Sequence, residues 1–482
     1  MTERYALDRA AADLAAVGLL RAVVVADAGV WREVAADAAA GGFQGAVLDS
    51  RDATRDSLFV GLSGTRTDGR RFVAGALAAG AQALIGPGKS DEPLVEGEAP
   101  VTGTVLVSDD PEAALTRLAS CWRERHHPTV VGITGSNGKT TTKDLLAALL
   151  GAAGTVHATS GNLNSAQGVP VTVLGLTAQH DYAVIEMGAS AVGHIAARAR
   201  LARPLVGVIT NAAAAHLEEF GTLAGVIEGK GELVAVLPAD GTAVLNADSP
   251  GFEIWNDRAT CPVVSWGQEQ GDHRWSWQPG DLETAGWLIL DDERWPVPLP
   301  GRHNGANLCA AILAARAVGL ADEVLRRGLR DFRPPAQRGA LRRLDGRLIL
   351  DDSYNANPES VCQAVRSLLD LAGGDAVAVL GFMAELGIDS EELHRDCGRN
   401  CAELGLERLV VVGEAARALA DGFAAAGGQV VLVADHAEAA DHLVAATTVG
   451  DRILVKGSRS STMERVLAEL ETRHGWREET TP

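Results

Sequence analysis

A short stretch around residue 135 restricts what this chain can fold into. The apolar run 130–133 leads into a glycine turn, Gly135-Ser136-Asn137-Gly138, which is followed by Lys139-Thr140-Thr141. Residues 144–150 then have the composition of a helix. A strand, a glycine loop and a helix in this order direct backbone N–H groups and the positive end of a helix dipole at an anion. The stretch predicts a phosphate-binding loop, and the plain alternative is an ordinary glycine turn before a helix.

The loop departs from the usual phosphate-loop spacing. The common form Gly-x-x-x-x-Gly-Lys would need a glycine at position 133, where this chain has Ile133. The tight element is instead Gly135-x-x-Gly138. Lys139 can still reach the β- and γ-phosphates of a nucleotide, and Thr140 can offer its hydroxyl to Mg²⁺. The residue types that handle phosphate are therefore present, although one glycine is displaced.

Length and charge narrow the class of protein. At ~150 residues per domain, 482 residues predict about three domains. The net charge of −20 argues against nucleic acid as a partner, because neutralising phosphates requires a basic surface. No run of ~18 apolar residues occurs, so we expect no membrane span. The cysteines are scattered without a Cys-x-x-Cys pair, which favours reduced, buried thiols in a cytoplasmic protein.

Short apolar runs that alternate with helical stretches divide the chain into three α/β units, 1–108, 109–334 and 335–482. In the first unit, alanine-rich residues 1–45 predict helix. In the second, strands are predicted at 131–134, 183–186 and 206–210, and the tryptophan-rich segment 241–300 predicts short antiparallel strands at the sheet edge. In the third, strands are predicted at 347–350, 376–380, 409–412, 430–433 and 453–455.

Polar side chains follow the strands of the second unit, where ligands of parallel sheets collect. Glu186 closes one predicted strand, His216 follows the next, and Lys230 lies on the helix after it. A carboxylate at position 186 can bind Mg²⁺ or cap the next helix. Taken alone, a histidine at position 216 is more often a packed or surface residue, and a lysine at position 230 is more often a solvated helix charge. Asn304, at the start of a later helix, can cap that helix or contact an adenine edge.

Together these motifs resemble the Mur ligases, the ATP-dependent amide-forming enzymes of peptidoglycan synthesis. The resemblance covers nearly the whole chain. It rests on Gly135–Thr141, Glu186-Met187-Gly188, His216-Leu217-Glu218, Lys230-Gly231-Glu232, Gly301-Arg302-His303-Asn304 and Lys456-Gly457-Ser458-Arg459. The stretch 351–358, Asp-Asp-Ser-Tyr-Asn-Ala-Asn-Pro, is similar to the family members that add a dipeptide. Ser165 and Phe382 depart from the family pattern, which usually shows asparagine and aspartate there.

The resemblance implies a fold and an activity. The fold is α/β in three domains: a small α/β UDP-binding domain, a central P-loop ATPase-like domain with a parallel sheet, and a C-terminal Rossmann-like α/β domain. The activity is an ATP-dependent amide ligase that adds D-alanyl-D-alanine to UDP-N-acetylmuramoyl-tripeptide through an acyl phosphate. The expected partners are these small molecules, ATP and two Mg²⁺ ions, and we expect a cytoplasmic monomer.

The resemblance also implies roles for single residues. The catalytic set is Lys139, Glu186, His216 and Lys230. The ATP-binding set is Gly135, Ser136, Asn137, Gly138, Lys139, Thr140, Thr141, Asn304, Arg338 and Asp352. The metal ligands are Thr140, Glu186, His216 and Lys230, the last as a carbamylated lysine. The UDP precursor would contact Ser50, Arg51 and Asn162, and the dipeptide or the closing third domain would involve Tyr354, Asn355 and Asn357.

Two other functions stay open from the sequence. One is a ligase of the same family that adds a diamino acid to a dipeptide precursor. The other is a nucleotide-binding scaffold without ligase activity. The set Lys139, Glu186, His216 and Lys230 argues against the scaffold, because a pure scaffold needs no metal ligands. The sequence does not distinguish lysine from diaminopimelate as the third residue of the tripeptide.

Overall fold

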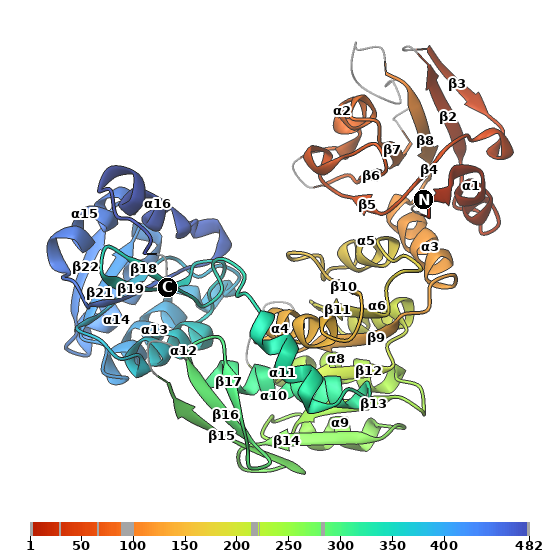
Figure 1. Ribbon diagram of the computed structural model, residues 1–482. Coiled ribbons are helices and arrows are strands. Elements are labelled where there is room, and N and C mark those ends of the chain that lie inside the picture. The colour runs from red at the N-terminus through yellow and green to blue at the C-terminus, as the bar shows by residue number, and fades with distance from the viewer. Residues whose placement is uncertain are drawn as a thin grey trace.

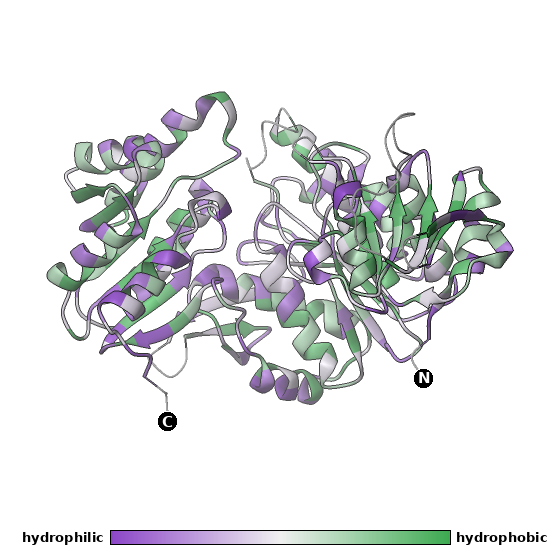
Figure 2. Ribbon diagram, turned by 90° about the horizontal axis from the view of Figure 1, so that it is seen from above, coloured by the Kyte–Doolittle hydropathy of each residue, from purple (hydrophilic) through white to green (hydrophobic). Residues whose placement is uncertain are grey.

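A computed structural model of the chain describes residues 3–27, 30–64, 67–87, 101–213, 220, 222–280 and 285–479. Three main sheets organise these residues, one in each of three successive segments of the chain. Figure 1 shows the N-terminal and C-terminal units on different sides of the central one. In Figure 2 the strands are mostly hydrophobic, while hydrophilic residues concentrate on the outer helices. Of the helices described, none has the length and hydropathy that crossing a bilayer requires.

The N-terminal unit is a six-stranded sheet in the order β3-β2-β8-β7-β6-β5. Its elements are β1 (Tyr5–Ala6), α1 (Leu7–Ala15), β2 (Ala22–Asp27), β3 (Val30–Val34), β4 (Gly42–Phe43), β5 (Ala46–Val47), β6 (Leu58–Gly61), α2 (Val73–Ala78), β7 (Gln82–Ile85) and β8 (Gly103–Val107). The prediction of helix over 1–45 was wrong beyond α1. The β-branched run Val23–Val25 lies in β2, which pairs with β3 and β8, so cross-strand packing outweighs the helix propensity of the alanines.

The central unit is a nine-stranded sheet in the order β10-β11-β9-β12-β13-β14-β15-β16-β17. The strands are β9 (Thr129–Thr134), β10 (Val156–Ala158), β11 (Tyr182–Glu186), β12 (Val206–Ile209), β13 (Thr242–Asn246), β14 (Val263–Gly267), β15 (His273–Pro279), β16 (Gly286–Leu290) and β17 (Glu293–Val297). The helices are α3 (Pro111–Arg123), α4 (Lys139–Gly151), α5 (Gly168–Leu174), α6 (His194–Ala202), α8 (Leu223–Val236), α9 (Phe252–Arg258), α10 (Arg302–Ala317) and α11 (Asp322–Asp331). The three predicted parallel strands are confirmed as β9, β11 and β12.

The tryptophan-rich segment only partly forms the antiparallel strands predicted for it. The pairs β15–β16 and β16–β17 are antiparallel, but β13 and β14 continue the parallel sheet. The reason is α9, a crossover helix between β13 and β14 that returns the chain in the same direction. The prediction that the tryptophans are core residues holds for Trp255, Trp266, Trp275 and Trp295, which are buried.

The C-terminal unit is a six-stranded sheet in the order β18-β19-β23-β20-β21-β22. Its strands are β18 (Ala340–Leu344), β19 (Arg347–Asp352), β20 (Ala376–Leu380), β21 (Arg408–Val412), β22 (Gln429–Val433) and β23 (Arg452–Lys456). Its helices are α12 (Pro358–Asp370), α13 (Ser390–Glu403), α14 (Arg417–Ala425), α15 (His436–Ala446) and α16 (Glu464–Arg473). All five predicted strands are confirmed, and of the strand pairs in the described part of this unit only β18–β19 is antiparallel.

Candidate active site

The glycine loop between β9 and α4 has a shape that only glycine allows at two positions. Gly135 and Gly138 have φ angles of +153° and +81°, in the left-handed half of conformational space. A Cβ atom on Gly135 would collide with the Thr210 hydroxyl, and one on Gly138 would collide with the Asn307 side chain. The displaced glycine, Gly135, is therefore required by the close approach of Thr210, and Gly138 by the close approach of Asn307 in α10.

Asn211, two residues after the end of β12 (Val206–Ile209), binds the backbone of this loop through hydrogen bonds. Its carbonyl accepts from the Ser136 N–H at 3.0 Å, and its side-chain oxygen accepts from the Asn137 N–H at 3.0 Å. Lys139 folds back over the loop, and its Nζ donates to the carbonyls of Gly135 at 2.7 Å and Ser136 at 3.0 Å. The lysine side chain thus lies against the loop, beside the N-terminus of α4, which is the end of a helix that favours a bound anion.

Lys139 and Glu186 interact electrostatically. Burial lowers the pKa of Lys139, the negative charge of Glu186 partly opposes this, and the positive charge of Arg338 adds to it. Glu186 ends β11 and is 2% exposed. Its Oε1 accepts a 2.7 Å hydrogen bond from Asn164 Nδ2, whereas its buried Oε2 has no hydrogen-bond partner among the described residues. A buried carboxylate oxygen without a partner is costly unless a cation or donor joins it.

Lys230 is a second lysine near the loop. It lies in α8, is 3% exposed, and its Nζ is 5.9 Å from the ring centre of Phe220. Burial lowers the pKa of this amine well below its ordinary value, and the positive charge of Lys139 lowers it further. No carboxylate counteracts these effects within the part of the chain described. The amine is thus held in its neutral, nucleophilic form over a wider pH range than an exposed lysine. His216 lies outside the described residues.

A narrow cavity is lined by several of the residues that were predicted to bind the nucleotide. It is bordered by the start of α4, the start of α10 and the C-terminal unit, and is lined by Thr141, Pro300, His303, Asn304, Arg338, Gly339, Leu350, Asp352, Ala364 and Ser367. Four of the predicted ATP-binding residues therefore share one cavity. The Arg338 guanidinium lies 3.9 Å from the ring centre of Tyr354, in a cation–π contact that orients it.

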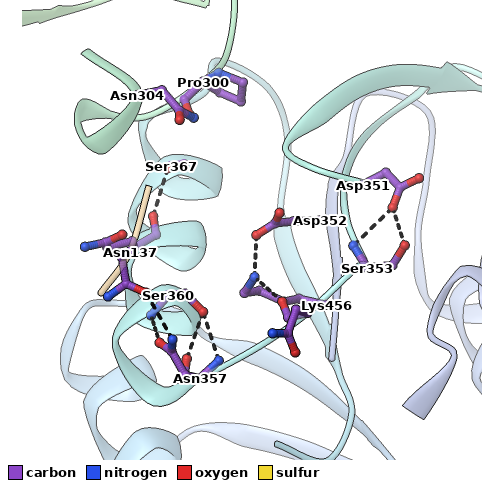
Figure 3. Close-up of polar contacts among 12 residues, drawn as sticks. Asn137, Pro300, Asn304, Asp351, Asp352, Ser353, Asn357, Ser360, Ser367 and Lys456 are labelled. Atoms are coloured by element: carbon purple, nitrogen blue, oxygen red, sulfur yellow. Dashed lines mark hydrogen bonds and ion pairs between the residues drawn. The ribbon is translucent and has the colours of Figure 1, made fainter. Parts of the chain in front are cut away.

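Asp352, at the end of β19, is engaged by Lys456 at the end of the neighbouring strand β23. Lys456 Nζ donates to Asp352 Oδ2 at 2.5 Å and to the Asn355 carbonyl at 2.8 Å. Figure 3 shows this pair facing the start of α12. Lys456 is buried and Asp352 is partly exposed, so the ion pair lies at the edge of the cavity, where the two bonds of Lys456 tie residue 352 to residue 355.

The start of α12 contacts the phosphate loop directly. Asn357 caps α12 through its side-chain oxygen, and its Nδ2 donates to Asn137 Oδ1 at 3.0 Å. Asn137 Nδ2 in turn donates to Glu359 at 2.6 Å. Figure 3 shows Asn137 against Asn357 and Ser360. The loop predicted to bind phosphate therefore has direct contacts with the C-terminal unit.

The residues predicted for the UDP precursor lie apart from this centre. Ser50 and Arg51 are in a short 3-10 helix, Ser50–Asp52, of the N-terminal unit, and Asn162 is exposed between β10 and α5. Helix α5 contacts β5, so the two segments belong to adjacent surfaces. Arg51 Nε donates to Asp49 at 2.9 Å, and this pairing lowers the pKa of Asp49 to about 2.

Both departures from the family pattern have a structural role. The Ser165 hydroxyl accepts from the Gly168 N–H at 3.1 Å and donates to Gln167 at 3.0 Å, which stabilises the start of α5. The Phe382 ring stacks on His394 with ring centres 4.8 Å apart. The Phe382 carbonyl accepts hydrogen bonds from Ser458 and Ser461.

Four residues of this centre were absent from the predicted site: Asn164, Asn211, Glu359 and Lys456. Two of them carry a local signal. Asn211 and Lys456 stand at the ends of buried strands, the same pattern that singled out Glu186. Asn164 and Glu359 carry no such signal, because their partners are 22 and 222 residues away in the chain.

Comparison with known proteins places this centre in a family. The family models described as "Mur ligase family, catalytic domain", "Mur ligase middle domain" and "Mur ligase, glutamate ligase domain" match residues 43–125, 133–315 and 338–459. The UDP-N-acetylmuramoyl-tripeptide–D-alanyl-D-alanine ligase of Escherichia coli is 36% identical over 433 residues, 88% of this chain and 92% of that protein. This chain belongs to the Mur ligase family.

Solved structures agree with this assignment. MurF from Acinetobacter baumannii superposes with a TM-score of 0.77 at 32% identity, covering 88% of this Mur ligase and 92% of that chain. MurF ligase from Thermotoga maritima in complex with ADP superposes with a TM-score of 0.73 at 28% identity, covering 89% and 98%. Like other members of its family, this Mur ligase is an ATP-dependent ligase.

Proposed function

We propose that this Mur ligase joins D-alanyl-D-alanine to UDP-N-acetylmuramoyl-tripeptide in peptidoglycan precursor synthesis, as a cytoplasmic monomer. The substrates are taken from the E. coli relative, which shares most of its length with this chain. The stretch 351–358 supports them, because it resembles the dipeptide-adding members of the family. The observation that carries the proposal is the convergence of Lys139, Glu186 and Lys230 at one end of the central sheet.

The chemistry of amide formation explains this convergence. A carboxylate is a poor electrophile, because an oxide would have to leave it. Transfer of the γ-phosphoryl group of ATP to the tripeptide carboxylate forms an acyl phosphate, from which phosphate can leave. The amine of D-alanyl-D-alanine then attacks the acyl carbon, and phosphate departs with formation of the amide. Attack of a carboxylate on a phosphate brings two anions together, so the site must supply positive charge.

Lys139 and the first-turn amides of α4 are suited to the β- and γ-phosphates. Lys139 has to release the loop carbonyls to reach them, and a phosphate oxygen is a stronger acceptor for an ammonium group than a carbonyl. Asn304, Arg338 and Asp352 line the cavity beside the start of α4, which supports the nucleoside side of ATP as its occupant.

The residues present fit Mg²⁺. The unpartnered Oε2 of Glu186 is a hard oxygen ligand, and Thr140 and His216 would complete the set. When bound, Mg²⁺ neutralises the phosphate charges during transfer. Lys230 would join as a carbamate formed from its neutral amine and CO₂ with release of one proton, which turns the amine into an anionic metal ligand. The lowered pKa of Lys230 supports that modification, because only the neutral amine reacts.

The three units would divide the work. We assign 1–108 to the UDP precursor, through Ser50 and Arg51 together with Asn162 of the adjacent surface. Residues 109–334 would bind ATP. Residues 335–482 would present the dipeptide near Tyr354 and Asn355 and exclude water from the acyl phosphate. The contact of Asn357 with Asn137 supports this last role, because it brings the third unit against the phosphate loop.

A substrate panel tests the proposal. Purified full-length protein with ATP and Mg²⁺ is given either UDP-N-acetylmuramoyl-tripeptide with D-alanyl-D-alanine, or UDP-N-acetylmuramoyl-dipeptide with a free diamino acid. ADP release and product mass are measured for each pair. We expect both signals only with the first pair. Tripeptide precursors ending in lysine and in diaminopimelate are compared within that arm.

Two outcomes would contradict the proposal. Product formation only with the diamino acid would identify the other ligase of the family. Phosphate release without amide formation from either pair would favour the nucleotide-binding scaffold.

A further inference from the structure

Three cysteines from two helices of the C-terminal unit lie close together. Cys362 lies in α12, and Cys397 and Cys401 lie in α13. Their sulfur atoms all lie within 4.8 Å of one another. Among the described residues, this is the one cluster of three or more His, Cys, Asp or Glu side chains with ligand atoms spaced for a metal ion. The role proposed above for this ligase does not use it.

Helix geometry accounts for the cluster. Cys397 and Cys401 are four residues apart, so they lie on the same face of α13, one turn from each other. Helix α12 packs against this face and adds the third sulfur. Three thiolates around an ion with metal–sulfur distances of ~2.3 Å lie ~3.8 Å from each other, so the sulfurs need to move by less than about 1 Å.

Burial and access also suit a bound ion. Cys397 and Cys401 are 1% and 0% exposed, so an ion between them is protected from water. Cys362 is only half-buried, which leaves a way in for the ion. The three ligand atoms of the cluster are all sulfur, and sulfur ligands favour soft, thiophilic cations over Mg²⁺ or Ca²⁺.

We propose that Cys362, Cys397 and Cys401 form a three-thiolate site for a thiophilic cation of the Zn²⁺ or Cu⁺ type. A shared ion uses all three sulfurs, whereas a disulfide would use two and leave the third without a role. The site would tie α12 to α13 one helical turn from Glu359, the residue of α12 that contacts the phosphate loop. It is separate from the Glu186 site in both position and ligand chemistry.

Titration with Cd²⁺ tests the proposal, because cadmium–thiolate bonds absorb in the ultraviolet. Reduced full-length protein is freed of reductant without oxygen and titrated with Cd²⁺ in excess Mg²⁺, which occupies oxygen-ligand sites. We expect a charge-transfer band that saturates at one equivalent and is abolished by Zn²⁺. Cys362→Ser should weaken Cd²⁺ binding by at least about a hundredfold, since loss of even an outer-shell partner costs ~10- to 100-fold.

Cys261→Ser is the matched control, because Cys261 is a buried thiol of the central unit outside the cluster. It should bind Cd²⁺ like the wild type. Thermal melting of each variant without Cd²⁺ confirms that it is folded, and melting of the wild type with Cd²⁺ should shift upward. An unchanged band in folded Cys362→Ser, or no band in the reduced wild type, would overturn the proposal. A protein that takes up no Cd²⁺ but reversibly loses two hydrogens at Cys362 would instead have a redox disulfide.

Discussion

Asn137 in the phosphate loop donates a 2.6 Å hydrogen bond to Glu359 in the first turn of α12, although 222 residues separate them. Burial raises the pKa of Glu359, and the hydrogen bond from Asn137 partly opposes this. Asn357 donates to the same asparagine, so two residues of the C-terminal unit hold one side chain of the loop. The C-terminal unit is therefore in direct contact with the loop that is predicted to bind phosphate.

Replacing Glu359 tests this contact. This hydrogen bond is exposed to solvent, where such a bond contributes about 0.5–1.5 kcal/mol, so Glu359→Ala should lower kcat/KM for ATP by roughly two- to tenfold. In the Asn137→Ala background the same replacement should have almost no further effect, because the two residues act as a pair. Glu391→Ala, at an exposed acid of α13, is the control. Additive effects of the two substitutions would show that Glu359 acts by another route.

Glu186→Gln keeps the shape of the side chain and its bond to Asn164 but removes the charge offered to a cation. We expect ADP release that depends on both substrates to fall by about a thousandfold, the scale of losing one preorganised electrostatic group. Binding of Mn²⁺, followed by electron paramagnetic resonance, should weaken in parallel. Glu124→Gln, at an exposed acid, should change neither. Normal Mn²⁺ binding by an inactive Glu186→Gln would remove the metal role from this residue.

Lys230→Ala should abolish activity, because it deletes the proposed carbamate. Addition of a short carboxylic acid should restore part of the activity by occupying the vacated space with a carboxylate. Lys143→Ala is a matched control, since Lys143 is also buried but donates to the Thr159 carbonyl, and acid should not rescue it. Intact mass measured on active, metal-loaded wild type should show the added CO₂. An unmodified amine in such a preparation would exclude the carbamate.

His303 should make the protein sensitive to mild acid. Burial lowers its pKa to about 4, while Asp352 raises it and Lys456 lowers it further. Between pH 4 and 6.5 the unfolded chain binds a proton that the folded protein does not, so stability falls as the pH drops through this range. Compared with His303→Gln, the wild type should lose about 2 kcal/mol of unfolding free energy between pH 7 and 5. Urea unfolding measures this, with His127→Gln as an exposed control, and parallel pH curves for wild type and His303→Gln would contradict the assignment.

Most strands of the second and third units were predictable, because buried parallel strands are continuous apolar runs between turn residues. Two expectations failed where tertiary contacts outweighed composition. The alanines of the first 45 residues predicted helix where the chain forms the paired strands β2 and β3. The tryptophan-rich segment predicted antiparallel strands where β13 and β14 are parallel and joined by a crossover helix. In both places the secondary structure depends on pairing with a neighbouring strand, which the local composition does not show.

The candidate site shows the same division. The order of residues along the chain was enough to predict the phosphate loop, because its strand, glycine turn, lysine and helix are adjacent in the sequence. The sequence alone also marked Glu186 by its place after a strand, whereas Lys230 was singled out only through the resemblance to the family. Only the tertiary structure decided why Gly135 and Gly138 are needed, since Thr210, just after β12, and Asn307, in α10, leave no room for a Cβ atom there. It alone joined Asn137 to Glu359 and gathered three cysteines, because those distances depend on how the helices pack.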